Sequence, residues 1–323
     1  MIEFDDFSKP SMGGTEIIKH GLQNRLPQEL LNKFQIICDR IISIDETRIR
    51  LFWVHNTPHQ VNNKHLENGG WEKFHRMIFI SHHQMEEYVR EYQIPYSHCV
   101  IMKYALEPIK PQPKPTDKIS LIYTSSPHRG LDILVNVFYK LCEEYNNLEL
   151  KVHSSYNIYA MSDRQKHYEH TPLYKKLEEH PNIKNIGYVS NEELKNSLAS
   201  SHIFPYPSTY HETFCLALLE AMSAGLLCVN SNYACLPETA SNWTMMYPYH
   251  EDKIVHSSIF YDYLKNAINS LNDRKIQRQL KYQSKYVNCF YNWETRTQEW
   301  IDLLKSLEHL NPKISKTISF NYS

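Results

Sequence analysis

The sequence predicts an α/β protein built from two doubly wound, parallel-sheet domains. Short apolar runs of strand length alternate with longer amphipathic segments, which is the pattern of a parallel sheet covered by helices. The chain has 323 residues, enough for two domains of ordinary size. Four closely spaced prolines within residues 107–116 predict a stiff, extended linker between these domains.

The first domain is expected to span residues 1–107 and to open with a strand at 1–4. A helix is expected at 14–25, where apolar residues recur with helical spacing. Ser81 is a candidate N-cap for a helix that ends near Tyr92. Further apolar runs predict strands at 34–38, 49–54, 77–80 and 99–102.

The second domain is expected to span residues 108–292, followed by a segment at 293–323 that holds a helix to 307 and a tail. Strands are predicted at 119–123, 148–153, 183–188, 203–206 and 226–229. Helices are predicted at 131–145, 172–179, 192–200, 212–224, 262–274 and 275–290.

Composition and charge exclude several classes of protein. The formal net charge of −1 argues against a nucleic-acid partner. The seven cysteines form no Cys-x-x-Cys pair and the 18 histidines show no zinc-like spacing, so we expect reduced thiols and no metal site. No apolar run reaches about 18 residues, so no membrane span or signal peptide is expected, and the predicted location is the cytoplasm.

Residues 205–225 form the strongest candidate for a binding site. Glu212 would lie at the mouth of the predicted helix and Glu220 about 12 Å further along its axis. Free N–H groups at the helix start would bind an anion. A carboxylate, a row of donors and a second carboxylate suit a nucleotide sugar, although an amphipathic helix with two solvated glutamates would have the same pattern. The donors would be the backbone N–H groups of Thr213, Phe214 and Cys215.

The loop after the strand at 119–123 holds a second candidate. The diphosphate of a bound nucleotide sugar can be held by a metal on an Asp-x-Asp motif, or by cationic side chains with a helix N-terminus. No Asp-x-Asp occurs in the sequence, so we expect a metal-independent site without a cofactor. Arg129 is the candidate cation, and Gly130 would let the backbone approach a phosphate. The alternative for Arg129 is an ordinary surface arginine.

Two further candidates lie in the first domain. Gly13 and Gly14 precede a predicted helix, where a phosphate could approach closely, and Thr15 adds a hydroxyl, although an ordinary turn has the same pattern. His55 follows a buried strand, at the edge of an open α/β sheet where ligands bind. A satisfied histidine at a strand end is the alternative.

Together these motifs resemble those of retaining GT-B glycosyltransferases of glycosyltransferase family 4, the glycosyl transferases group 1. The Glu-x7-Glu pair follows a Pro-Ser turn and precedes Ala-Met-Ser-Ala-Gly. The order and spacing of the motifs match over most of the chain. The other matching segments are the glycine loop at 11–16, the phosphate loop at 124–131, the base segment at 187–194 and the end of the donor site at 237–239.

The resemblance implies two Rossmann-like domains facing across a cleft. Residues 1–107 would bind the acceptor and residues 108–292 the nucleotide sugar. The helix in 293–323 would pack back on the first domain. It implies catalytic roles for His55, Arg129 and Glu212, with Glu212 on a sugar hydroxyl. Donor contacts would come from Gly13, Gly14, Thr15, Ser125, Tyr188 at the base, Thr213, Phe214, Cys215 and Glu220 at the ribose. The donor would be a UDP- or GDP-sugar and the acceptor a glycan, lipid or protein, with room for peripheral membrane contact.

Two features depart from the family pattern. Ser125 stands where the family often has a second cation, and the first domain is short, with elements trimmed near residues 39–50 and 60–75. A degenerate module that binds a nucleotide sugar or a partner without turnover therefore remains an alternative. A sugar phosphorylase or nucleotide-sugar epimerase on the same architecture is another.

Overall fold

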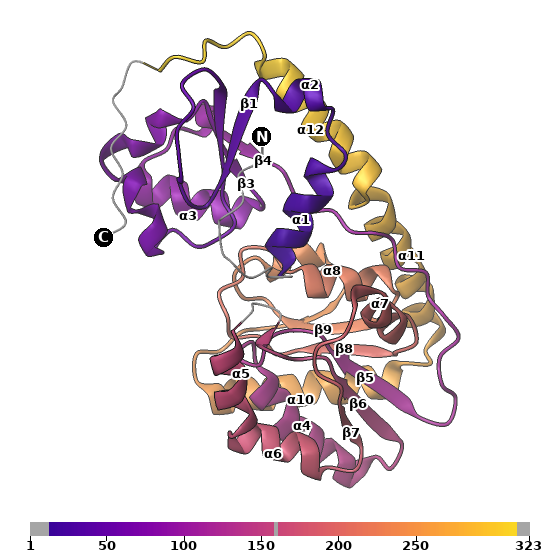
Figure 1. The fold of residues 1–323 in the computed structure, drawn as a ribbon. Helices are drawn as coiled ribbons and strands as arrows, with labels where there is room; N and C mark the ends of the chain where they lie inside the picture. Colours follow the sequence, from indigo (N-terminus) through magenta and orange to yellow (C-terminus); the bar gives the residue numbers. More distant parts are fainter. Residues whose placement is uncertain (1–12, 158–160, 315–323) are drawn as a thin grey trace. The chain divides into compact units, whose positions relative to one another are not determined.

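The computed structural model describes residues 13–157 and 161–314, and the chain divides into two compact units (Figure 1). The N-terminal unit comprises Met1–Ala105 and Tyr291–Ser323, and the second unit comprises Leu106–Phe290. The strand expected at 1–4 lies outside the described residues.

The N-terminal unit has a four-stranded parallel sheet in the order β1-β2-β3-β4. The first two strands are buried along their whole length, as expected for strands with both faces covered. The predicted strands agree with the observed ones to within one residue at each end. The bounds are β1 Phe34–Cys38, β2 Ile49–Trp53, β3 Arg76–Phe79 and β4 Cys99–Ile101.

Two helices of the N-terminal unit, α1 and α3, were predicted from the sequence. Ser81 caps α3 by accepting a hydrogen bond from the Gln84 N–H group at 3.0 Å. The sequence analysis expected trimming at 60–75, but η1 occupies this stretch, broken by left-handed conformations at Asn68 and Gly69. The bounds are α1 Gly14–Gln23, α2 Gln28–Leu31, η1 Val61–Lys73, α3 His82–Tyr92, η2 Tyr96–His98 and α12 Trp293–Leu307.

The core of the N-terminal unit covers both faces of its sheet. On one face, Phe52 and Met77 pack with Leu66 of η1 and Tyr88 of α3. On the other, Trp53 packs edge-to-face against Trp300 of α12, with ring centroids 4.9 Å apart. The helix from the end of the chain is therefore part of the core built by the first strands.

The second unit has a six-stranded parallel sheet in the order β10-β9-β8-β5-β6-β7. The chain first builds outward from β5 through β6 to β7 and then returns to β8 beside β5, so the sheet is doubly wound and its switch point lies between β5 and β8. The bounds are β5 Ile119–Tyr123, β6 Leu148–Val152, β7 Ile183–Asn185, β8 Ile203–Tyr206, β9 Leu227–Ser231 and β10 Met245–Tyr247.

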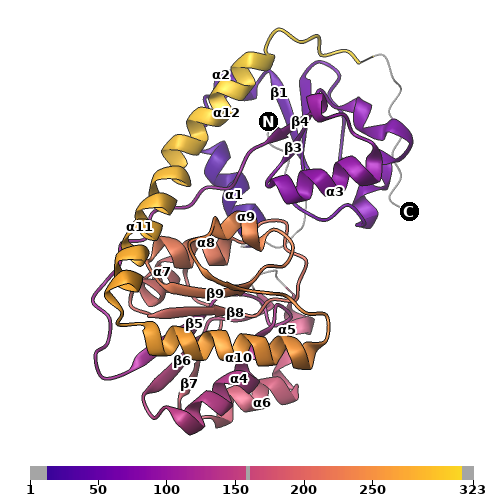
Figure 2. The same cartoon turned by 180° about the vertical axis from the view of Figure 1, so that it is seen from behind.

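Helices cover both faces of this sheet. Figures 1 and 2 show α4, α6 and α10 on one face and α7, α8 and α11 on the other. The bounds are α4 Leu131–Glu144, α5 Ser162–Glu169, α6 Pro172–Glu179, α7 Asn191–Ala199, α8 Leu216–Ser223, α9 Leu236–Ala240, α10 Lys253–Ser270 and α11 Arg274–Phe290.

Two predicted helix starts are wrong. α10 begins at Lys253 rather than at 262, because the Asp252 carboxylate caps it by accepting from the N–H groups of Ile254 and Val255. α8 begins at Leu216 rather than at 212, after an extended residue at Cys215.

The proline-rich stretch belongs to the second unit. The Ile109 N–H group donates to Ser223 Oγ at 2.9 Å, and the Gln112 N–H group donates to the Ala199 carbonyl at 3.1 Å. The Lys114 ammonium donates to the Gly225 carbonyl at 3.1 Å. The stretch is therefore a strap fixed to α7 and the end of α8, and the division between the units falls before it, after Ala105.

Within the part of the chain that the structure describes, no helix is long and apolar enough to span a bilayer.

Candidate functional site

Arg129 and Glu212 lie beyond the carboxyl ends of β5 and β8, at the switch point of the second sheet. β5 ends at Tyr123 and its loop leads to α4, whereas β8 ends at Tyr206 and its loop leads to α8. Because β5 and β8 are neighbours in the sheet, their two loops are adjacent. Ligands of open α/β sheets bind at this position.

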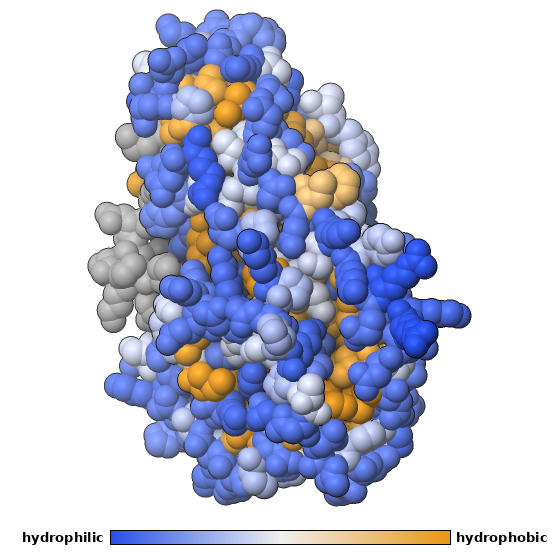
Figure 3. All heavy atoms as spheres, turned by 90° about the vertical axis from the view of Figure 1, so that its right-hand side faces the viewer, coloured by the Kyte–Doolittle hydropathy of each residue, from blue (hydrophilic) through white to orange (hydrophobic). Residues whose placement is uncertain are grey.

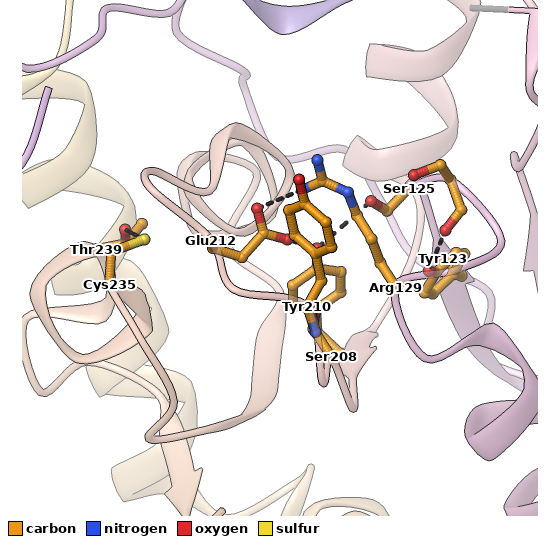
Figure 4. Close-up of polar contacts among 10 residues, drawn as sticks. Tyr123, Ser125, Arg129, Ser208, Tyr210, Glu212, Cys235 and Thr239 are labelled. Carbon is orange, nitrogen blue, oxygen red and sulfur yellow. Dashed lines mark hydrogen bonds and ion pairs between the residues drawn. The ribbon is translucent and has the colours of Figure 1, made fainter. Parts of the chain in front are cut away.

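Both oxygens of the Glu212 carboxylate have a partner. The Arg129 guanidinium donates from Nη1 to Oε2 as an ion pair (Figure 4). The Tyr206 hydroxyl donates to Oε1 at 2.6 Å. The Glu212 side chain is only 2% exposed. A buried carboxylate is stable only when its charge is paired, so Arg129 and Tyr206 stabilise Glu212 in its buried position.

The Arg129 side chain has a second contact beside the carboxylate. Its guanidinium lies 4.4 Å from the ring centroid of Tyr210, and one fifth of the side chain is exposed. Ser125 Oγ lies 3.4 Å from the Tyr206 hydroxyl. Arg129, Glu212, Tyr206 and Ser125 thus form one polar network with the guanidinium at its accessible end.

Gly130 has a packing role that the sequence analysis did not give. Its φ is +92°, and a Cβ atom there would lie 2.2 Å from the Pro207 carbonyl oxygen. Glycine is therefore required because the β5 loop packs against the β8 loop. The expected close approach of a phosphate is not needed to explain it.

The candidate N–H donors precede α8 and do not form its first turn. Phe214 and Cys215 are buried, and the Cys235 N–H group donates to the Glu212 carbonyl at 3.3 Å, which fixes the extended approach to the helix. Burial raises the pKa of the Cys215 thiol to about 12, so this thiol is neutral. Thr213, Phe214 and Cys215 are thus placed in the loop leading to the helix.

Glu220 lies inside α8, apart from the Arg129 network. Burial raises the pKa of its carboxyl to about 7, and the charge of Lys195 on α7 opposes this shift. Among the residues that the structure describes, none donates a hydrogen bond to this carboxyl. Glu220 is thus a half-buried carboxyl with a raised pKa, a property that is common among groups at functional sites.

The segments matched to the base and to the end of the donor site differ in exposure. Tyr188 is 52% exposed and follows Gly187, whose φ is +72°. Thr239 in α9 is buried, with its hydroxyl 3.8 Å from the Cys235 thiol (Figure 4). Tyr188 is thus accessible to a ligand, whereas the Thr239 side chain packs inside the unit.

In the N-terminal unit, His55 and Thr15 meet at Tyr104. His55 Nδ1 lies 2.6 Å from the Tyr104 hydroxyl, which also hydrogen-bonds the Thr15 side chain. Gly13 and Gly14 start the adjacent helix, as its N-cap and first residue. The structure therefore brings His55, Thr15 and the glycine pair to one place, and Tyr104 joins them.

The histidine of this cluster is held neutral. Burial, assisted by the charge of Lys19, lowers the pKa of His55 well below its usual value. Burial also raises the pKa of Tyr104 well above its usual value. His55 and Tyr104 are thus a neutral hydrogen-bonded pair, and the backbone N–H group of His55 donates to Asp39 Oδ1 at 2.7 Å.

The sequence analysis did not single out Tyr104, Tyr206 or Tyr210. Tyr206 is the last residue of β8, Tyr104 closely follows β4, and Tyr210 lies in the β8 loop. A tyrosine at the carboxyl end of a predicted parallel strand was the available signal, because that edge carries the ligand sites of such sheets.

Comparisons with known proteins identify the family and the fold of this chain. The family model described as glycosyl transferases group 1 matches residues 105–285, more than half of the chain. A phosphatidylinositol N-acetylglucosaminyltransferase subunit of Arabidopsis thaliana is 30% identical over 125 residues, which cover 38% of this chain and 26% of that protein. The match thus spans about a quarter of that relative's length.

Solved structures share the fold. A glycosyltransferase from Rickettsia africae aligns with a TM-score of 0.66 and 13% identity, covering 94% of this chain and 85% of that one. Anabaena HepE in complex with UDP-glucose aligns with a TM-score of 0.65 and 12% identity, covering 87% and 81%. With two parallel-sheet α/β units, these alignments show the GT-B fold. The chain belongs to the glycosyl transferases group 1 family.

Proposed function

We propose that this chain transfers a sugar from a nucleotide-sugar donor to an acceptor hydroxyl, with retention and without a bound metal. The observation that carries the proposal is the Arg129–Glu212 ion pair at the switch point of the second sheet. Arg129 is a partly exposed cation that can bind a phosphate, and Glu212 is a buried carboxylate that can accept a sugar hydroxyl. The two side chains are in direct contact.

Donor binding would exchange the partners of this pair. The donor diphosphate binds the Arg129 guanidinium. This charge-assisted hydrogen bond to phosphate replaces the bond from the guanidinium to the Glu212 carboxylate. The freed oxygen of Glu212 accepts a hydroxyl of the donor sugar, while Tyr206 keeps the other oxygen in place. The carboxylate therefore remains paired throughout, which avoids a bare buried charge.

Glu220 is proposed to bind the ribose. Its carboxyl has a pKa of about 7 and lies inside α8, the helix that follows the Glu212 loop. Ribose hydroxyls would donate to the ionised form, and Tyr188 would lie against the base.

The transfer itself would need no protein nucleophile. The bond between the anomeric carbon and the diphosphate oxygen breaks, and the acceptor oxygen attacks the same face. The leaving phosphate oxygen takes the acceptor proton, and Arg129 stabilises the charge that develops there. His55 and Tyr104, both neutral, would orient the acceptor by hydrogen bonds.

The named relatives narrow the donor and acceptor classes. UDP-glucose is the ligand in the HepE structure, which supports a UDP-sugar, and a GDP-sugar is the next candidate. The Arabidopsis relative is named as one component of an enzyme and for transfer to phosphatidylinositol. A lipid acceptor and an assembly with other chains are therefore proposed ahead of a free glycan or a protein acceptor.

One observation favours a second function, a module that binds a nucleotide sugar without turnover. Ser125, whose hydroxyl is 3.4 Å from Tyr206, occupies the place of the family's second cation. A single guanidinium would then have to stabilise the whole leaving group.

The test is a panel of UDP-, GDP-, ADP- and dTDP-sugars, with EDTA present, read by thermal shift and by release of the nucleoside diphosphate. We expect one donor to stabilise the protein and to be hydrolysed slowly, and Arg129→Ala to abolish both effects. Arg274→Ala, an exposed arginine elsewhere in the same unit, is the matched control. Stabilisation without release, with acceptors supplied, would favour the binding module, and no binding would refute both functions.

A further inference from the structure

Helix α11, Arg274–Phe290, carries an unusual concentration of positive charge. It contains five cationic residues and no carboxylate, although the whole chain has a net charge of −1. At 100° per residue the five side chains fall within an arc of about 120° on the helix. All of them are exposed: Arg274, Lys275, Arg278, Lys281 and Lys285.

The opposite side of α11 fixes the helix to the second unit. Leu280 and Val287 are buried there. The Gln283 side-chain amide donates to the Leu226 carbonyl at 2.9 Å, and the Ser284 hydroxyl donates to the Ser223 carbonyl at 2.6 Å. The cationic face is therefore presented outward on a rigid support.

These cations differ from the lysines of the preceding helix. On α10, Lys253 pairs with Asp132 and Lys265 pairs with Glu144. Within residues 13–157 and 161–314, none of the five cations of α11 forms an ion pair with a carboxylate. Arg278 instead lies over the ring of Tyr282, at 5.7 Å from its centroid.

Exposed aromatic rings accompany the charge. Tyr282 is 48% exposed within the same arc, and Phe290 at the end of the helix is 56% exposed. Figure 3 looks at the side on which α11 lies in Figure 1 and shows a mostly hydrophilic surface with separate hydrophobic patches. Aromatic rings beside cations suit the boundary between lipid headgroups and acyl chains.

We propose that the cationic face of α11 binds the surface of an anionic phospholipid bilayer. The five cations supply electrostatic attraction to acidic headgroups, and Tyr282 can enter the interface beside them. The rest of the chain has 30 cationic and 36 acidic residues, and this excess of negative charge disfavours a nucleic acid, which would need a wider basic surface.

The proposal is tested by sedimentation of the full chain with vesicles. One set contains phosphatidylcholine alone, and two others contain about one phosphatidylserine or one phosphatidylglycerol in three lipids. We expect binding to both anionic sets, none to the neutral set, and loss of binding at high salt because the charges are exposed. Similar binding to the two anionic lipids is expected for recognition by charge alone.

A triple variant locates the binding surface. Arg278→Gln, Lys281→Gln and Lys285→Gln together should weaken binding to anionic vesicles about 100-fold, or about 1 kcal/mol per cation. The control removes the same charge from exposed positions outside α11 and should bind like the unaltered chain. It combines Lys140→Gln, Lys166→Gln and Lys175→Gln.

Several outcomes would overturn the proposal. These are equal binding to neutral and anionic vesicles, no vesicle binding at all, and equal weakening by the two triple variants. Binding to an RNA oligomer in preference to the anionic vesicles would also refute it. Donor hydrolysis by the α11 variant reports separately on the Arg129 site, so failure here is distinct from failure of the proposed transferase.

Discussion

The candidate sites of the two units are stabilised in different ways. In the second unit, opposite charges on Arg129 and Glu212 neutralise each other in a buried position. In the N-terminal unit, His55 and Tyr104 are both neutral and share a hydrogen bond of 2.6 Å. Loss of one partner therefore leaves a bare buried charge in the second unit, but only an unmade hydrogen bond in the first.

This difference matches the two halves of the proposed reaction. A charged pair can exchange partners with a diphosphate, whose charge replaces that of the carboxylate. A neutral pair can orient hydroxyl groups without competing for that charge.

The largest effect is expected for Arg129→Ala. Release of the nucleoside diphosphate should fall at least about 100-fold, since the variant loses the cation that stabilises the leaving group. The free energy of unfolding of the second unit should fall by about 3 kcal/mol because Glu212 is left buried without its ion-pair partner. Urea unfolding and single-turnover release measure the two effects. Equal loss in Arg274→Ala would contradict the assignment.

A smaller and separable effect is expected for His55→Ala. Removal of the imidazole should cost about 2 kcal/mol of stability, because it leaves a cavity and an unmade hydrogen bond to Tyr104. Transfer to acceptor should fall about 10- to 100-fold, whereas the affinity for the nucleoside diphosphate should not change. Calorimetric titration measures the nucleotide affinity of the variant. Weaker nucleotide binding by His55→Ala than by the unaltered chain would refute the separation of the two sites.

The third prediction concerns the pH dependence of donor binding at Glu220. Its pKa of about 7 lies above the usual 4.5, so its contribution to folding is complete below about pH 4.5 and is lost as the pH rises through 7. Ribose binding has the opposite sign, because its hydroxyls donate to the ionised carboxylate.

Nucleotide affinity should therefore rise with pH by up to about tenfold per unit below pH 7 and level off above it. Glu220→Gln should remove this dependence and leave the fold intact. An unchanged pH profile in that variant would show that Glu220 does not contact the donor.

The smallest effect is expected for Tyr206→Phe, which removes only the hydroxyl. Glu212 keeps its ion pair with Arg129 but loses the bond of 2.6 Å to its other oxygen, so stability should fall by about 1 to 2 kcal/mol. Donor release should slow by about tenfold through the loss of carboxylate orientation. Separate measurements of kcat and KM distinguish a hydroxyl that orients Glu212 from one that only stabilises the fold. If the role of the hydroxyl were purely structural, kcat of the folded fraction would be unchanged.

Strands β1, β2, β5, β8 and β9 were predictable because they are buried along nearly their whole length and therefore read as apolar runs. Strand β10 was missed, because it has only three residues and two of them are half-buried. The start of α10 was not predictable, because the exposed Ile254 in its first turn gives no amphipathic pattern. η1 was not predicted for a similar reason, because its asparagines and glycines give no helical periodicity of apolar residues. Local patterns are informative only where burial imposes a period.

At the site, the residues were easier to predict than their contacts. Arg129 and Glu212 were each expected to contact a donor, but their ion pair joins positions 83 residues apart and depends on β8 returning beside β5. Tyr206 and Gly130 acquire their roles from the same adjacency. Strand order is a property of the whole sheet, which no local motif determines.

The exchange of partners by Arg129 is tested most directly by the affinity of the matching nucleoside diphosphate, without its sugar, for Glu212→Gln and Arg129→Ala. If the diphosphate competes with Glu212 for the guanidinium, Glu212→Gln should bind it several-fold more tightly than the unaltered chain, and Arg129→Ala much more weakly. Weaker binding by both variants would contradict the account, because Glu212 would then assist the diphosphate rather than compete with it.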